Sequence, residues 1–434
     1  MFKRLIKWCF YALIIFVLLL FVSEFIPYGN TNYSYLDFFR IKASRIIEKS
    51  SFKGQKPNDL LNQEVVDSLD IPFYSVSFDD DVQDYFNDLW KGYEEGFDGV
   101  TYSEKGQEYY IENRKWQKAM ITTPSGTFKV KIRSHGKLPD NHHYGENFSF
   151  QVKGDELKEY YRVSKLRFII YQRIKEKNDH LVFMEENFQL LRAKRNEMVK
   201  VSMNGNLEHL YFLEFNDLAT SNQSNNKILQ EVGVHKSGIS AMSNDVDIDK
   251  DELNNIRFKD EYMQFQKAID ENNSEYVLSV SEEEYLLNYF AVKAIYGFSG
   301  HECYPANFHM YLDTITMKFY PAISREPVFN PLYNKDDLKD ALITYNHAVL
   351  DRSSTVLSYY KAVLSNSTFF SKLKAHLSSI IKEKSKAIIS NWNENIERHK
   401  LYWQQSFLWY SLYPEKSLES IEDNLDWISE QLAD

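Results

Sequence analysis

The chain has 434 residues, of which 43% are hydrophobic and 15% aromatic, so it can bury a sizeable core and is not a disordered chain. Its formal net charge of −11 argues against sequence-independent nucleic-acid binding, because such binding needs a basic protein face. Its two cysteines, Cys9 and Cys303, are too few for a thiolate metal site, and we expect no disulfide between them because Cys9 falls in an apolar run.

The amino terminus predicts a membrane anchor. Residues 8–22 carry no charged side chain, and the apolar run resumes at residue 25 after Ser23 and Glu24. Residues 8–28 together reach about the 20 residues that a helix needs to cross the hydrocarbon core. Lys3, Arg4 and Lys7 precede this segment, so the positive-inside rule predicts a cytoplasmic N-terminus and an extracytoplasmic C-terminal domain. We expect an uncleaved, single-pass signal anchor in a bacterial cytoplasmic membrane. The alternative is a cleavable signal peptide, although Ser23-Glu24-Phe25 lacks the small-x-small cleavage pattern.

The remaining chain divides by composition and periodicity into three parts. Residues 29–62 are polar and mixed, which predicts a juxtamembrane linker. Residues 63–330 carry mixed strand and helix patterns and form the main domain, in which the polar, weakly periodic residues 219–260 indicate an insert. Residues 331–434 show helical spacing to the end and predict a C-terminal helical region.

The first half of the main domain mixes both periodicities. Period-2 alternation predicts strands over residues 71–78, 109–123, 128–133 and 147–153. Helical spacing predicts helices over residues 79–93, 165–177 and 179–192. Asn204-Gly205, flanked by alternating apolar residues, predicts a β-hairpin over residues 198–215.

The second half of the main domain predicts a helix followed by a polar loop and a hairpin. Ser281 and Glu284 form a capping box that should begin a helix ending near Gly297. Strands are expected over residues 308–313 and 317–323.

Polar residues gather around this second hairpin. The loop before it carries His301, Glu302 and Asn307, and its second strand leads into Arg325 and Glu326. Polar groups at the ends of paired strands can form a site on a rigid support. A polar loop without function is the alternative interpretation.

Four short motifs follow one another along residues 129–326. They are Arg133 with Gly136, a strand running from Ser149 to Lys153, the Asn204-Gly205 hairpin leading to Glu214, and Glu302 five residues before Asn307. In this order they resemble the CotH (spore coat protein H) kinase family, in its large membrane-anchored bacterial variants. His209 and the early position of Glu214 depart from the family pattern.

The resemblance implies an α+β chain with a divergent protein-kinase-like two-lobed fold, which binds ATP and Mg²⁺ or Mn²⁺ in a cleft between a sheet-rich lobe and a helical lobe. It implies that Lys153 contacts the nucleotide phosphates and that Glu185 or Glu186 pairs with it. Glu214 approximates another glutamate of the nucleotide site.

The resemblance also implies a catalytic and metal-binding loop. Glu302 stands at the position of the family's catalytic Asp, and Asn307 at that of a metal ligand. Arg325 falls where the family has a second, acidic metal ligand, and Glu326 can replace that ligand only if the register shifts by one residue. Because phosphoryl transfer depends on charge neutralisation by metal, Arg325 argues for weak or absent activity.

We expect a membrane-anchored atypical kinase with weakened or degenerate catalysis, which if active would transfer a phosphoryl or nucleotidyl group from ATP to a protein or cell-envelope acceptor. The alternative is a catalytically inactive kinase-like scaffold in envelope or surface-polymer assembly. A third interpretation, a membrane-tethered protein that handles carbohydrate, depends only on the Tyr and Trp content.

Overall fold

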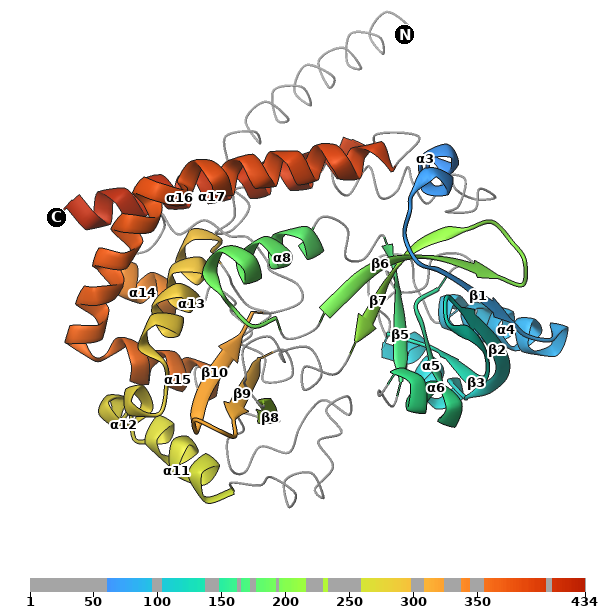
Figure 1. Ribbon diagram of the computed structural model, residues 1–434, viewed down its shortest axis with the longest axis horizontal. Helices are drawn as coiled ribbons and strands as arrows, with labels where there is room; N and C mark the ends of the chain where they lie inside the picture. Colours follow the sequence, from blue (N-terminus) through green and yellow to red (C-terminus); the bar gives the residue numbers. More distant parts are fainter. Residues whose placement is uncertain are drawn as a thin grey trace, which may run out of the picture.

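The computed structural model describes residues 61–95, 104–136, 148–161, 165–171, 177–192, 195–215, 229–232, 259–297, 308–323, 337–343, 355–402 and 408–433. These residues form a β-barrel on one side and a helical part with a small second sheet on the other (Figure 1).

The amino-terminal strands form a closed seven-stranded barrel in the order β1-β2-β3-β4-β5-β7-β6. Neighbouring strands pair antiparallel, except that β1 closes the barrel by pairing in parallel with β6. The strands of the barrel are β1 (Phe73–Ser77), β2 (Gln117–Thr123), β3 (Gly126–Ser134), β4 (Phe150–Lys153), β5 (Leu166–Ile170), β6 (Arg195–Met203) and β7 (His209–Phe215).

The barrel corrects the fold class implied by the resemblance. The kinase-like two-lobed fold is wrong, because the amino-terminal sheet closes on itself through β1 and β6. These two strands lie far apart in the sequence, so no local pattern reveals their pairing.

Alternating apolar side chains fill the barrel and fix which side of each strand faces inward. Val130, Ile132 and Val152 are buried in this core, and so are Ala119 and Ile121. The residues between them in the sequence therefore point outward, since successive side chains of a strand alternate between its two faces.

The helical part packs against the antiparallel sheet β10-β9-β8. The second sheet contains β8 (Leu229–Val232), β9 (His309–Asp313) and β10 (Lys318–Ala322). Four helices lie with the barrel (Figure 1): α3 (Gln63–Ser68), α4 (Asp80–Glu95), α5 (Glu104–Asn113) and α6 (Asp155–Tyr161). The described helices of the helical part are α8 (Lys177–Phe188), α11 (Lys259–Asp270), α12 (Ser274–Ser279), α13 (Glu283–Ile295), α14 (Leu338–Ile343), α15 (Thr355–Leu364), α16 (Ser367–Leu401) and α17 (Leu408–Ala433). In Figure 1 the long α16 runs along the helical part toward the barrel, where α3 lies.

Most of the strongly patterned elements were predicted correctly. The expected hairpin over residues 198–215 is confirmed, and Asn204 and Gly205 both have positive φ, as a two-residue turn of type I′ requires. The strands predicted over residues 308–313 and 317–323 are β9 and β10. The predicted insert contains β8, which pairs with β9.

Three local predictions are wrong. The helix expected from residue 165 is strand β5, because its apolar side chains face the barrel core on one side and a second cluster on the other, which hides the alternation. The strand predicted from residue 109 begins only at Gln117, because residues 109–113 are the end of α5. The predicted capping box does not form. The Ser281 hydroxyl donates to the Val277 carbonyl, and the N-cap residue Glu282 makes no side-chain hydrogen bond to α13.

No helix in the described ranges is long and apolar enough to cross a membrane. The predicted anchor over residues 8–28 lies outside those ranges.

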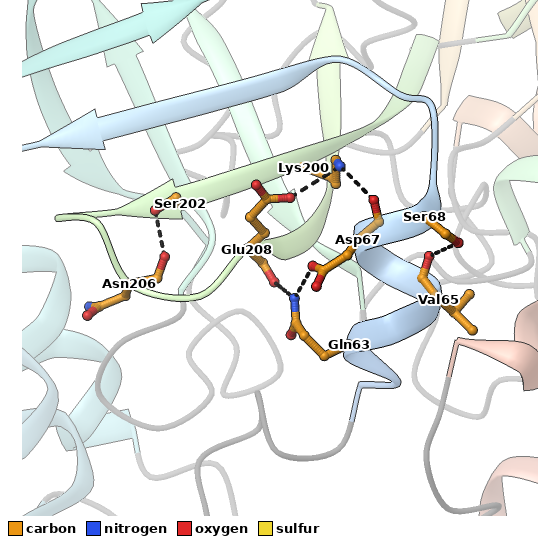
Figure 2. Close-up of polar contacts among 8 residues, drawn as sticks. All are labelled: Gln63, Val65, Asp67, Ser68, Lys200, Ser202, Asn206 and Glu208. Atoms are coloured by element: carbon orange, nitrogen blue, oxygen red, sulfur yellow. Dashed lines mark hydrogen bonds and ion pairs between the residues drawn. The ribbon is translucent and has the colours of Figure 1, made fainter.

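Helix α3 attaches the start of the described chain to the β6–β7 hairpin (Figure 2). Gln63 donates to the Glu208 carbonyl over 3.3 Å and to the Asp67 carboxylate over 2.8 Å. Lys200 lies 3.2 Å from the Glu208 carboxylate and donates to the Asp67 carbonyl. The backbone amide of Asn62 donates to the Tyr402 carbonyl, so α3 also reaches the end of α16.

A buried chain of hydrogen bonds joins the barrel to the helical part. Nδ1 of His399, in α16, hydrogen-bonds to the hydroxyl of Tyr171, which follows β5. Nε2 of His399 lies 3.0 Å from the carboxylate of Asp179 in α8, and Arg398 lies 3.1 Å from the same oxygen. His180 stacks on Trp392 beside this chain, and complete burial lowers its pKa to about 3.

Burial raises the pKa of Asp179, but the hydrogen bond from His399 and the charges of His399 and Arg398 outweigh it, so the net pKa lies below its usual value. The depressed pKa adds stability above about pH 3.9, the unfolded value, and this stability is lost as the pH falls through the folded value.

Asp179→Asn should therefore lower the free energy of unfolding by about 1–3 kcal/mol near pH 7. The difference from wild type should shrink as the pH falls below about 4. Denaturant unfolding at several pH values measures both effects. Asp84→Asn, at an exposed position of α4, is the control for losing one carboxylate. An Asp179→Asn effect that stays constant down to pH 3 would contradict this linkage.

Candidate functional site

The structure describes three of the predicted site residues, and they lie on three different elements. Lys153 lies on β4, Glu214 on β7 and Glu186 on the exposed side of α8. Glu302, Asn307 and Glu326 lie outside the described residues. Within the described ranges, no three or more His, Cys, Asp or Glu side chains gather in a way that could hold a metal ion.

Glu214 makes a buried ion pair within the barrel wall. Its fully buried carboxylate lies 2.9 Å from the guanidinium of Arg167, which is directly opposite it on β5. If this carboxylate bound a ligand instead, the Arg167–Glu214 pair would break and leave an uncompensated charge, which costs free energy. We therefore interpret Glu214 as a structural residue that fixes β7 against β5.

Glu214→Gln should lower the free energy of unfolding by about 3 kcal/mol, because it leaves the Arg167 guanidinium without its buried counter-charge. Thermal or denaturant unfolding measures the loss. Glu186→Gln is the matched control, because it removes a carboxylate from an exposed position and should change stability little. Equal stability of the two variants would show that the Arg167–Glu214 pair is not structural.

The glutamates of α8 do not pair with Lys153. Glu185 lies 2.7 Å from Nε of Arg192, which follows α8. Next to Arg192, the amide of Ile323 donates to the Leu191 carbonyl, so this pair lies at the end of β10. The resemblance implied that Glu185 or Glu186 pairs with Lys153. Among the described residues, neither glutamate makes that contact.

Lys153 belongs instead to a group of basic side chains on the outer wall of the barrel. We call this group the basic face, and it consists of Lys118, Lys129, Lys131, Arg133 and Lys153. Each member alternates with a residue of the barrel core, so each points outward. Lys118, Lys129 and Lys131 are exposed, and the other two are half-buried.

Strand register aligns three lysines in one row. Lys118 of β2 is directly opposite Lys131 of β3, and Lys131 is directly opposite Lys153 of β4. Like charges at directly opposite positions destabilise a sheet. Of the ion pairs formed among the described residues, none involves a lysine of this row. The row therefore costs stability, which is typical of positions kept for function.

An aromatic ring supports the edge of the basic face. Nζ of Lys153 lies 4.3 Å from the centre of the Trp116 ring, and Cζ of Arg133 lies 4.6 Å from it. Such cation–π contacts hold a cation in place without neutralising it. In the amide orientation that satisfies both groups, Gln151 accepts two hydrogen bonds from Arg133, at 2.6 and 2.9 Å. The guanidinium is thereby fixed beside Lys153.

Glycine is required where β4 ends next to this face. A Cβ at Gly154 would lie 2.7 Å from the Lys129 carbonyl oxygen, which is closer than real Cβ atoms approach. The close approach of the two backbones keeps Lys129 on the same part of the wall as Lys153.

Of the basic face, Lys153 was predicted as a site residue and Arg133 as part of a motif, whereas Lys118, Lys129 and Lys131 were not predicted. The alternation Lys129-Val130-Lys131-Ile132-Arg133 signals a strand with one basic side. Lys118 could not be added from the sequence, because its place in the row depends on the register between β2 and β3.

No protein-family model matches the chain, and a search of curated proteins returns no match.

Lys131→Gln should raise the free energy of unfolding by about 0.2–1 kcal/mol, because Lys131 is the middle of three aligned lysines. The gain should shrink in high salt, which screens exposed charges. Denaturant unfolding at low and high ionic strength tests both points.

Lys382→Gln, at an exposed position of α16, is the matched control and should show no such gain. If Lys131→Gln lowers stability at every salt concentration, the aligned lysines are not under repulsion.

Proposed function

We propose that this protein is a scaffold of the bacterial cell envelope that binds a phosphate-bearing ligand on the basic face of its barrel. The observation that carries the proposal is the row formed by Lys118, Lys131 and Lys153, in which no lysine is ion-paired with another described residue. A phosphate-bearing ligand would supply the negative charges that this row lacks. Binding would relieve the repulsion among the three lysines, and this relief would add to the free energy of binding.

The negative net charge of the chain limits where an anionic ligand can be attracted. With a net charge of −11, the protein as a whole repels anions at long range. A ligand would therefore be attracted only near the basic face, within about one Debye length of 8–10 Å. This favours specific binding over general attraction to anions.

A second candidate function is ATP-dependent transfer of a phosphoryl or nucleotidyl group to a protein or envelope acceptor. The position of Lys153 in the basic face favours it, since a lysine there can contact the phosphates of a bound nucleotide. Mg²⁺ or Mn²⁺ would neutralise the same phosphates in such a reaction. The proposed catalytic residue Glu302 and the proposed metal ligands Asn307 and Glu326 depend on the sequence resemblance alone.

The proposed location is the outer side of the cytoplasmic membrane, with residues 8–28 as a single-pass anchor. It depends on the apolar run and the basic residues before it. The barrel would then meet envelope components directly.

The first test is the melting temperature of the full-length protein in detergent, with inorganic triphosphate or with ATP, each with and without Mg²⁺. At 100 times its dissociation constant, a ligand that binds only the folded state adds about 2.7 kcal/mol. We expect triphosphate to raise the melting temperature of the wild type.

The variant Lys131→Gln/Lys153→Gln should lose this shift, and Lys382→Gln/Lys386→Gln should keep it, since the second pair removes two exposed lysines from α16. A shift that requires both ATP and Mg²⁺ would favour the transferase. No shift with any phosphate compound would refute both candidate functions.

A further inference from the structure

The shape and charge spacing of the basic face identify the class of its ligand. We infer that the ligand is a linear polymer with repeated phosphodiester groups, a class narrower than phosphate compounds in general. This inference rests on the proposed function, because it names the ligand of the same face.

The charges are spread over more of the wall than one phosphate group can contact. Lys118, Lys131 and Lys153 occupy three adjacent strands, which lie about 4.8 Å apart, so the row extends across roughly 10 Å. Lys129 precedes Lys131 by two residues and adds a charge about 7 Å along β3. A ligand that meets all four ammonium groups needs several phosphates in series.

The basic face is also the outside of a closed barrel. Such a wall is convex, whereas sites for small ligands are concave and bury most of the ligand's surface. A convex row of charges suits an extended chain that lies across the strands. Lys118, Lys129 and Lys131 are exposed, as contact with such a chain requires.

The face lacks the features that favour two other polyanions. Single-stranded nucleic acids bind with their bases stacked on aromatic rings, but the ring of Trp116 already carries Lys153 and Arg133. An anionic membrane would face the protein as an extended surface, and the net charge of −11 opposes that approach. A single polymer strand meets only the basic face.

The experiment measures the affinity of the full-length protein in detergent for synthetic glycerol phosphate oligomers of graded length, by titration calorimetry at two salt concentrations. We expect the affinity to rise roughly tenfold or more with length until the oligomer spans the row, and then to level off. The salt dependence should steepen over the same lengths, because each added phosphate contact releases counterions.

Two double variants distinguish binding by the aligned lysines from a general effect of net charge. Lys118→Gln/Lys131→Gln removes two of the aligned charges and should abolish the dependence on length. Lys382→Gln/Lys386→Gln on α16 changes the net charge by the same amount and should leave the dependence intact.

The outcomes distinguish this inference from the proposed function. Equal affinity for oligomers of all lengths, with binding of inorganic triphosphate retained, would refute the polymeric ligand but not the proposal that the basic face binds phosphate groups. Tighter binding to single-stranded oligonucleotides of equal charge, or to vesicles containing phosphatidylglycerol, would also overturn it. Absence of binding to every phosphate probe would overturn both.

Discussion

The parallel pair between β1 and β6 decides which surfaces the rest of the molecule can use. Once this pair closes the barrel, every strand has an inner side that must be apolar and an outer side that must be covered or solvated. The outer sides of β5 and β7 are covered, since Ile169, Tyr171 and Phe212 pack with residues of α3 and with Tyr402. The outer sides of β2, β3 and β4 carry the lysines of the basic face instead. Closure therefore separates a wall packed against α3 and Tyr402 from a wall on which Lys118, Lys129 and Lys131 are exposed.

The sequence predicts those parts of this arrangement that depend on neighbours in the chain. The hairpin at Asn204-Gly205 and the strand ending at Lys153 have clear local patterns, and both were predicted correctly. Strand β5 carries apolar residues on both sides, with Arg167 among them, so the period-2 alternation is hidden. Barrel closure and the alignment of Lys118 with Lys131 depend on pairing between distant segments, which a single sequence does not encode locally.

The predicted site residues separate into two physical classes. Glu214 and Glu185 are each committed to an arginine, and such pairs hold elements in register. Lys153 is different, because a cation–π contact positions its charge without cancelling it. The resemblance to kinases grouped these residues as one nucleotide site. Their contacts instead assign the glutamates to the framework and leave Lys153 as the described member suited to meet an anion.

The row of Lys118, Lys131 and Lys153 differs from two largely buried carboxylates elsewhere in the described structure, which are paired with basic side chains. Asp179 is held by His399 and Arg398 at the junction of barrel and helices, and the Arg167–Glu214 pair lies in the barrel wall. At these two places the fold pairs a largely buried carboxylate with a basic side chain. A chain with 62 acidic residues could readily place a carboxylate opposite Lys131, yet its register places lysines on both sides. An excess of one charge, in a protein of the opposite net charge, is best explained by a ligand that supplies the missing anions.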